Sequence, residues 1–243
     1  MKRLTLIAVA LFVVEAGYAD EKSHWAYSGA EGPEHWGALS PDFIACSTGK
    51  SQSPINLTDA VRSDLKPIEF HYQAGGNEIV NNGHTVQVNY APGSRLSVDG
   101  RDFELKQFHF HAPSENLVNG KSYPLEAHLV HADKDGNLAV VAVMFVEGAE
   151  NASLAHAWAH LPANVGEKVS LSSVAVEGLL PSKRDYYRYD GSLTTPPCSE
   201  GVRWIVLKEP LTASPAQLEA FTHVMHHANN RPVQPLNARV VLQ

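Results

Sequence analysis

The sequence predicts a mostly β protein with a few peripheral helices, built as one domain. Its 243 residues are 44% hydrophobic, which suits one large core better than two small ones. Short runs of alternating or continuous apolar residues recur along the chain, and turn signals such as the "NG" at 119–120 lie between them. Only two segments have the spacing of helices, and the sequence has no internal repeat or low-complexity tract.

Six segments have the length and pattern of strands. They are "HTVQVNY" (84–90), "RLSVDG" (95–100), "KQFHFHA" (106–112), "LEAHLVHAD" (125–133), "NLAVVAVMFV" (137–146) and "RWIVLKEP" (203–210). Clusters of turn residues, "APGS" at 91–94 and "DKDGN" at 133–137, separate neighbouring pairs of these segments. We therefore expect most of the chain to form β-sheet.

Two segments predict helices, "SLAHAWAHL" (153–161) and "SPAQLEAFTHVMHHAN" (214–229). In the second, Ser214 is a preferred N-cap residue, and Pro215 suits the first helical position, where no N–H donor is needed. We expect both helices to lie at the periphery of the sheet.

The first 19 residues have the pattern of a secretory signal peptide. A basic start precedes an apolar run (4–14), and small residues lead up to a cleavage site after Ala19. The apolar run is about half the roughly 20 residues needed to cross a bilayer, so a membrane anchor is the less favoured alternative. We expect residues 20–243 to form the mature domain, in the periplasm or secreted.

The chain is acidic, with a formal net charge of −7 at pH 7 and no cluster of Lys and Arg. Loss of the signal would make the charge more negative, because it removes Lys2 and Arg3 but only one acidic residue, Glu15. A nucleic-acid partner is therefore not expected, and neither is a membrane span.

Both cysteines of the chain, Cys46 and Cys198, lie in the part predicted to be exported. An oxidising compartment favours a disulfide between them. Such a bridge would close a loop of about 150 residues and stabilise the fold by at most about 5 kcal/mol in the chain-entropy description. Two free buried thiols are the alternative.

Histidines on two predicted strands indicate a metal site. Side chains alternate along a strand, so in "QFHFH" (107–111) His109 and His111 share one face while the two phenylalanines point to the core. By the same rule His128 shares a face with Glu126, and it completes a cluster of three imidazoles if the two strands pair. Three neutral imidazoles suit Zn²⁺ and leave a fourth position for water, which is the pattern of catalytic zinc.

Other interpretations of these histidines stay open. A single pair of histidines on a strand is often solvent-exposed and without a function. Here Glu115 and Glu126 favour a metal site, since a zinc-bound imidazole needs a hydrogen-bond acceptor on its other nitrogen. The spacing in "HFHAPSE" also fits the first cupin motif, with Glu115 as an iron or manganese ligand, although the second cupin motif is absent. The histidines of the predicted helices are interpreted as solvent-exposed: His156, His160, His223, His226 and His227.

Taken together, these residues give the chain a sequence that resembles the α-class carbonic anhydrases of the exported bacterial kind. The resemblance lies in an ordered set of segments: "HWAYSG", "GPEHW", "QSPINL" (52–57), "NNGH" (81–84), "QFHFH", "SENLVNGKSYPLEAHLV" (114–130), "YDGSLTTPPC" (189–198) and "WIVLKEP" (204–210). It implies a single domain around a large twisted, mainly antiparallel β-sheet of about ten strands with short peripheral helices.

The resemblance also implies a reaction, the reversible hydration of carbon dioxide to bicarbonate and a proton by zinc-bound hydroxide, with the three histidines as zinc ligands. His84 would shuttle the proton, which needs a base that titrates near neutral pH. Thr194 would link the hydroxide to Glu115. The other implied residues are Gln107 and Glu126, which would orient imidazoles; Tyr27, Asn82 and Gln87, which would order water; Thr195, beside the substrate; and Val130, Val140, Leu193, Val202 and Trp204, an apolar wall for carbon dioxide.

Carbon dioxide and bicarbonate are the implied partners, and sulfonamides and anions are the implied inhibitors. Hydrolysis of activated esters would be a side reaction of the same hydroxide. The alternative function is a catalytically inactive carbonic-anhydrase-like binding domain, but such proteins typically lack one of the three histidines. A homodimer is one oligomeric state that the sequence leaves open.

Overall fold

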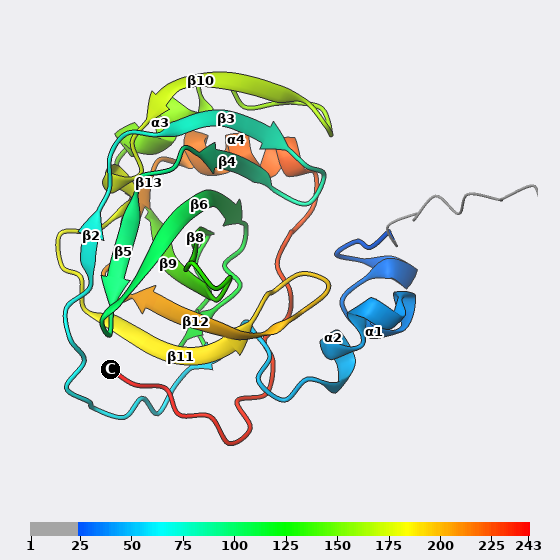
Figure 1. The fold of residues 1–243 in the computed structure, drawn as a ribbon. Helices are drawn as coiled ribbons and strands as arrows, with labels where there is room; N and C mark the ends of the chain where they lie inside the picture. Colours follow the sequence, from blue (N-terminus) through cyan, green and yellow to red (C-terminus); the bar gives the residue numbers. More distant parts are fainter. Residues whose placement is uncertain (1–23) are drawn as a thin grey trace, which may run out of the picture.

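Within residues 24–243, which the computed structural model describes, a large curled β-sheet of 11 strands forms the body of the protein (Figure 1). The predicted signal peptide lies outside the described residues. The strands of this sheet are β2 (Glu69–His71), β3 (Gly76–Asn81), β4 (Val86–Tyr90), β5 (Arg95–Val98), β6 (Arg101–His111), β8 (Leu125–Ala132), β9 (Leu138–Glu147), β10 (Lys168–Val174), β11 (Tyr186–Ser192), β12 (Glu200–Leu207) and β13 (Leu211–Ala213). Two short strands, β1 (Asn56–Leu57) and β7 (Leu117–Val118), pair with each other.

The strands neighbour one another in the order β10-β3-β4-β6-β8-β9-β12-β11, while β5 joins β2 to β6 and β13 pairs with β9. The pairings of β9 with β12 and with β13 are parallel, and the other pairings of the large sheet are antiparallel in the described residues. The predicted fold class, a large and mainly antiparallel sheet with short helices, is confirmed. All six predicted strands are present.

The helices are short: α1 (Trp36–Leu39), α2 (Ala45–Thr48), α3 (Ala152–Trp158) and α4 (Pro215–Met225), with the 3-10 turns η1 (Gly29–Glu31), η2 (Pro41–Phe43) and η3 (Glu177–Leu179). The Ser214 hydroxyl caps α4 by accepting the Gln217 N–H at 3.3 Å, as its position predicted. The predicted end of this helix at residue 229 is wrong. His226 adopts a left-handed conformation with φ of 60°, so α4 ends at Met225 and the following residues form a loop.

The main hydrophobic core lies between the sheet and the helices α3 and α4. Phe108 and Phe110 of β6 are fully buried there, as their alternation predicted. The ring of Phe110 packs against Trp158 of α3 and Phe221 of α4, at centroid distances of 5.4 and 6.0 Å. Burial of these aromatic rings anchors β6, so the opposite face of the strand is held in a defined position.

The N-terminal segment with α1 and α2 lies beside the sheet (Figure 1). A disulfide joins Cys46 of α2 to Cys198 in the loop after β11, with a Cα–Cα distance of 5.0 Å, which confirms the predicted pairing. The same loop carries Thr194 and Thr195. Among the described residues, no helix has the length and apolar character that crossing a membrane requires.

Candidate functional site

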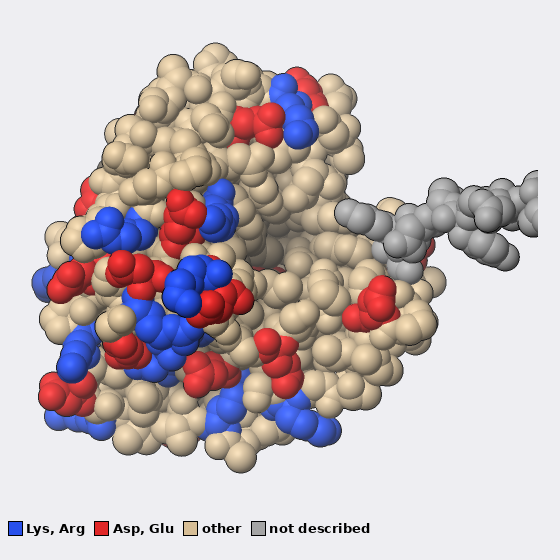
Figure 2. All heavy atoms as spheres, viewed as in Figure 1, with Lys and Arg blue, Asp and Glu red and all other residues tan. Residues whose placement is uncertain are grey.

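Three histidines meet on the face of the sheet opposite the main core. In the register of β6 and β8, His109 lies directly across from His128, and His111 lies across from Glu126. One nitrogen from each of the three imidazoles lies within 4.8 Å of the others. Figure 2 shows a hollow in the molecular surface, beside the place where β6 ends in the same view of Figure 1. The strand pairing that the sequence required for a three-imidazole cluster is therefore present.

In each imidazole, one nitrogen points toward the other two rings (the inner nitrogen), and the other (the outer nitrogen) is hydrogen-bonded to an acceptor. His109 Nδ1 donates to Gln107 Oε1 at 2.8 Å, and His128 Nε2 donates to Glu126 Oε1 at 2.9 Å. These oxygens can only accept, so the outer nitrogen carries the proton and the inner nitrogen keeps its lone pair. Gln107 and Glu126 thus lie where the sequence resemblance implied.

The third imidazole, His111, has a hydrogen-bond acceptor that sequence reasoning missed. His111 Nδ1 donates to the backbone oxygen of Asn229 at 2.7 Å. Its other nitrogen, Nε2, is buried and has no hydrogen-bond partner among the described residues. Burial is the largest cause that lowers the pKa of all three imidazoles, so they are neutral, which is the form that binds a metal ion.

A buried carboxylate, Glu115, lies beside the cluster. Its Oε2 is 3.5 Å from His111 Nε2 and 3.9 Å from His128 Nδ1, and its Oε1 accepts the backbone N–H of Arg231 at 2.8 Å. Burial raises the pKa of Glu115 well above its ordinary value, while the Arg231 N–H and the Thr194 hydroxyl lower it. Oε2 is buried and has no hydrogen-bond partner within the described residues. Thr195 accepts the Cys198 N–H with its backbone oxygen at 2.9 Å.

A group of apolar residues lies next to His128. Val130 lies across from Val140 in the β8–β9 pair, and Val140 lies across from Trp204 in the β9–β12 pair, so the three form one cross-strand row. Val202 and Leu193 belong to the same apolar cluster, which is separate from the main core. The rings of His128 and Trp204 have centroids 4.9 Å apart. The five residues of the predicted wall are therefore together and next to a candidate metal ligand.

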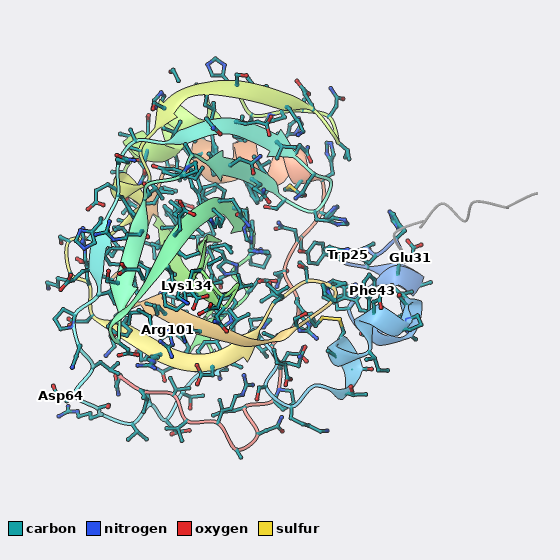
Figure 3. The ribbon with its side chains drawn as sticks, viewed as in Figure 1. Trp25, Glu31, Phe43, Asp64, Arg101 and Lys134 are labelled. Carbon is teal, nitrogen blue, oxygen red and sulfur yellow. A yellow bond between two sulfur atoms is a disulfide. The ribbon has the colours of Figure 1, made fainter. Side chains whose placement is uncertain are left out.

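The residues predicted to handle protons and water lie at the hairpin of β3 and β4 and at the N-terminal segment. His84 is half-buried, and its ring stacks on Trp25 at 3.7 Å between centroids. Figure 3 labels Trp25 where the N-terminal segment approaches the body of the molecule. Tyr27 is 6.4 Å from His84 by ring centroids, and its hydroxyl is buried without a hydrogen-bond partner in the described part of the chain.

The two predicted amides make protein contacts of their own. The side-chain oxygen of Asn82 accepts the backbone N–H of His84 at 2.9 Å, so it shapes the hairpin that carries this imidazole. Gln87 lies directly across from His109 in the β4–β6 pair and donates to Asn89 at 2.7 Å. Asn82 is therefore next to His84, and Gln87 is next to His109; both were predicted to order water between His84 and the metal site.

Sequence reasoning also missed Arg231, which is 1% exposed. Its guanidinium donates to Gln52 Oε1 at 2.9 Å and to the backbone oxygens of Ser53 at 2.8 Å and Cys46 at 3.0 Å. Burial lowers its pKa from 12.5 to about 10, with Glu115 opposing the shift. Asn229 and Arg231 stand in a loop without hydrophobic periodicity, so no local signal in the sequence marks them.

The remaining histidines behave as predicted where they were interpreted as solvent-exposed. His156, His160, His223, His226 and His227 are all exposed. His160 lies beyond the end of α3, so it shares no helix face with His156. Within the described residues, the three imidazoles of β6 and β8 are the one group with metal-binding geometry.

Comparisons with known proteins agree on one family. Residues 31–243 match the family described as eukaryotic-type carbonic anhydrase. A carbonic anhydrase of Pectobacterium carotovorum is 52% identical over 243 residues, which cover all of both chains. One of Neisseria gonorrhoeae is 45% identical and covers 100% of this chain and 97% of its own. The solved α-carbonic anhydrase of Thermovibrio ammonificans, in complex with the inhibitor sulfanilamide, has 56% identity and a TM-score of 0.89, covering 91% of this chain and 99% of that one.

Proposed function

Because the chain belongs to the eukaryotic-type carbonic anhydrase family, we propose that it hydrates carbon dioxide reversibly with a zinc ion held by His109, His111 and His128. The observation that carries the proposal is the convergence of three neutral imidazoles whose outer nitrogens are already hydrogen-bonded. Zn²⁺ favours three imidazoles with a fourth position open for catalysis. The buried, unpartnered Nε2 of His111 is the atom that a metal ion would satisfy.

Bound Zn²⁺ would supply hydroxide at neutral pH, because zinc lowers the pKa of water to about 7 in carbonic anhydrases as a class. We assign the orientation of this nucleophile to Thr194, whose hydroxyl would donate to Glu115 and accept from the nucleophile. That arrangement turns a lone pair toward the substrate. Burial raises the pKa of Glu115 well above its ordinary value, and the N–H of Arg231 and the hydroxyl of Thr194 oppose that shift, toward the ionised carboxylate that this role requires.

The apolar wall of Val130, Val140, Leu193, Val202 and Trp204 would hold carbon dioxide against the nucleophile. Carbon dioxide has no net dipole and accepts hydrogen bonds weakly, so water competes little with apolar side chains for it, and the same side chains exclude water from the site. Thr195 would contact substrate or solvent beside this wall.

His84 would take up the proton that hydration releases. Burial and the nearby imidazoles of His24 and His227 lower its pKa from 6.5, so at neutral pH the ring is in the neutral form that accepts a proton. Tyr27, Asn82 and Gln87 would order the water molecules between this ring and the metal centre.

An inactive binding domain is not favoured, because all three histidines are present and meet in space. The family match replaces the cupin interpretation, in which Glu115 would be an iron or manganese ligand. We further propose residues 20–243 as one mature domain in the periplasm or secreted after cleavage of residues 1–19. The disulfide and the bacterial relatives support this location. Sulfonamides are expected to inhibit the enzyme, since a sulfonamide binds the Thermovibrio ammonificans relative.

Stopped-flow measurement of carbon dioxide hydration tests the proposal. The purified protein should bind one zinc ion per chain, accelerate hydration, and lose activity with a strong chelator or a sulfonamide. Activity should return when zinc is added back after the chelator is removed. Stoichiometric zinc without any acceleration of hydration would refute the function while leaving the metal site intact.

A further inference from the structure

A small cavity at the edge of the site brings three imidazoles together outside the metal centre. We call it the rim cavity, and it is lined by His24, Trp25, Tyr27, Gly83, His84 and His227. Its volume is about 190 Å³, enough for several water molecules. His227 has no role in the hydration steps proposed above.

The position of His227 follows from the end of α4. The left-handed conformation of His226 turns the chain away from the helix axis, and the ring of His227 then lies 6.0 Å from Tyr27 by centroids. The ring of Tyr27 also lies 6.4 Å from that of His84 by centroids. Both imidazoles line the rim cavity, but His84 is half-buried while His227 is exposed to bulk solvent.

The hydrogen bond of His227 leaves one nitrogen ready to accept a proton. Its Nδ1 lies 3.1 Å from the backbone oxygen of Ala228, which can only accept, so Nδ1 carries the proton in the neutral ring. Nε2 therefore keeps its lone pair. An imidazole with one N–H and one lone pair can accept a proton at one nitrogen and release one from the other.

Asn229 ties the two imidazoles to one rigid frame. Its side-chain amide donates to the backbone oxygen of His84 at 3.0 Å and to that of Phe110 at 2.9 Å, and its side-chain oxygen accepts the N–H of Ala112 at 2.8 Å. His227 is two residues away along the chain. The backbone of His84 is therefore tied by hydrogen bonds to a residue two positions from His227.

Charge in the rim cavity opposes the accumulation of protons. His24 Nδ1 lies 3.0 Å from Glu31 Oε2. A positive charge on His24 or His227 disfavours a charge on His84 and lowers its pKa. A proton taken up by His84 is therefore released more readily, and Tyr27 adds no charge because burial raises its pKa well above its ordinary value.

We propose that His227 accepts the proton from His84 and delivers it to a buffer base, so that the rim cavity is a two-imidazole exit route for protons. In the first step protonated His84 becomes neutral as Nε2 of His227 gains the proton, through water in the cavity. In the second step the buffer base takes the proton and His227 returns to its neutral form. This inference rests on the proposed carbon dioxide hydration.

Stopped-flow kinetics in dilute buffer test the route with the full-length mature enzyme loaded with zinc. The variants are His227→Ala, His227→Gln, His84→Ala, the double variant His84→Ala/His227→Ala, and His223→Ala as a control. His223 is an exposed imidazole on α4 that does not line the rim cavity. Proton release follows the loss of bicarbonate, so it limits kcat in dilute buffer but does not enter kcat/KM.

Both His227 variants should lower kcat in dilute buffer about three- to tenfold, a modest part of what proton transfer contributes to catalysis, and leave kcat/KM unchanged. Free imidazole should restore kcat. The double variant should be no slower than His84→Ala, because His227 acts after His84. His223→Ala should match the wild type.

Three results would overturn the route while the function stands: an unchanged kcat in both His227 variants, a parallel loss of kcat/KM, or full additivity in the double variant. A wild-type enzyme that binds zinc but does not hydrate carbon dioxide would overturn the proposed function as well. The two failures are therefore distinguishable in one set of measurements.

Discussion

Acidification should destabilise the fold through His131, an imidazole buried on the face of β8 away from the metal centre. Its exposed fraction is 0%, and both ring nitrogens are satisfied in the neutral form. Nε2 accepts the hydroxyl of Tyr72 at 2.7 Å, and Nδ1 donates to the backbone oxygen of Ala139 at 3.3 Å. A proton added to Nε2 would break the first bond and leave a buried charge.

The size of the effect follows from the pKa of His131, which burial lowers from 6.5 to about 3. Below pH 6.5 the unfolded chain binds a proton at this residue, whereas the folded chain does not bind one until about pH 3. Stability from His131 is therefore complete above pH 6.5 and is lost as the pH falls toward 3. One pKa unit corresponds to 1.36 kcal/mol, so a fall from about pH 7 to about pH 5 should cost about 2 kcal/mol.

Denaturant unfolding of the wild type and of His131→Gln, each at about pH 7 and about pH 5, isolates this contribution. Glutamine does not titrate, and any constant packing cost cancels when each protein is compared with itself. The wild type should lose about 2 kcal/mol more than the variant on acidification. Equal losses in the two proteins would refute the assignment of this acid sensitivity to His131.

Three further predictions concern the disulfide, a carboxylate that orients a candidate metal ligand, and the helix cap. Cys46→Ser should lower the free energy of unfolding by at most about 5 kcal/mol, because the bridge spans 152 residues; a melting temperature insensitive to reducing agent would contradict this. Glu126→Gln should weaken zinc binding about 10- to 100-fold in chelator competition, because every group that hydrogen-bonds to Glu126 is a donor and cannot pair with the NH₂ of glutamine. An unchanged zinc affinity would count against this role of Glu126. Ser214→Ala should cost about 1 kcal/mol in thermal unfolding through loss of the α4 cap, and an unshifted transition would show that the cap is dispensable.

Local pattern was sufficient for the strands that carry the candidate ligands. β6 and β8 lie in the interior of the sheet, and their alternation of apolar and polar residues predicted which faces His109 and His128 share. Among the strands that the sequence reading missed, β10 lies at one end of the strand order. Edge strands are less covered, and β10 has only one buried residue, Val174.

Contacts between distant segments were beyond local pattern. The hydrogen bond from His111 to Asn229 joins residues 118 apart, and that from Arg231 to Glu115 joins residues 116 apart. No periodicity or spacing encodes such a pair. The helix boundary at Met225 was misplaced for a related reason, because the backbone reversal at His226 depends on the docking of the following loop and not on helix propensity.

The late position of Asn229 and Arg231 in the chain gives the enzyme an order of assembly. All three candidate ligands are synthesised well before the segment that holds His111 and Glu115 in place. A partly made chain can present imidazoles to a metal ion, but it cannot yet fix the tautomer of His111 or the position of the carboxylate. We therefore expect metal binding at these imidazoles to require the completed chain with its C-terminal segment docked.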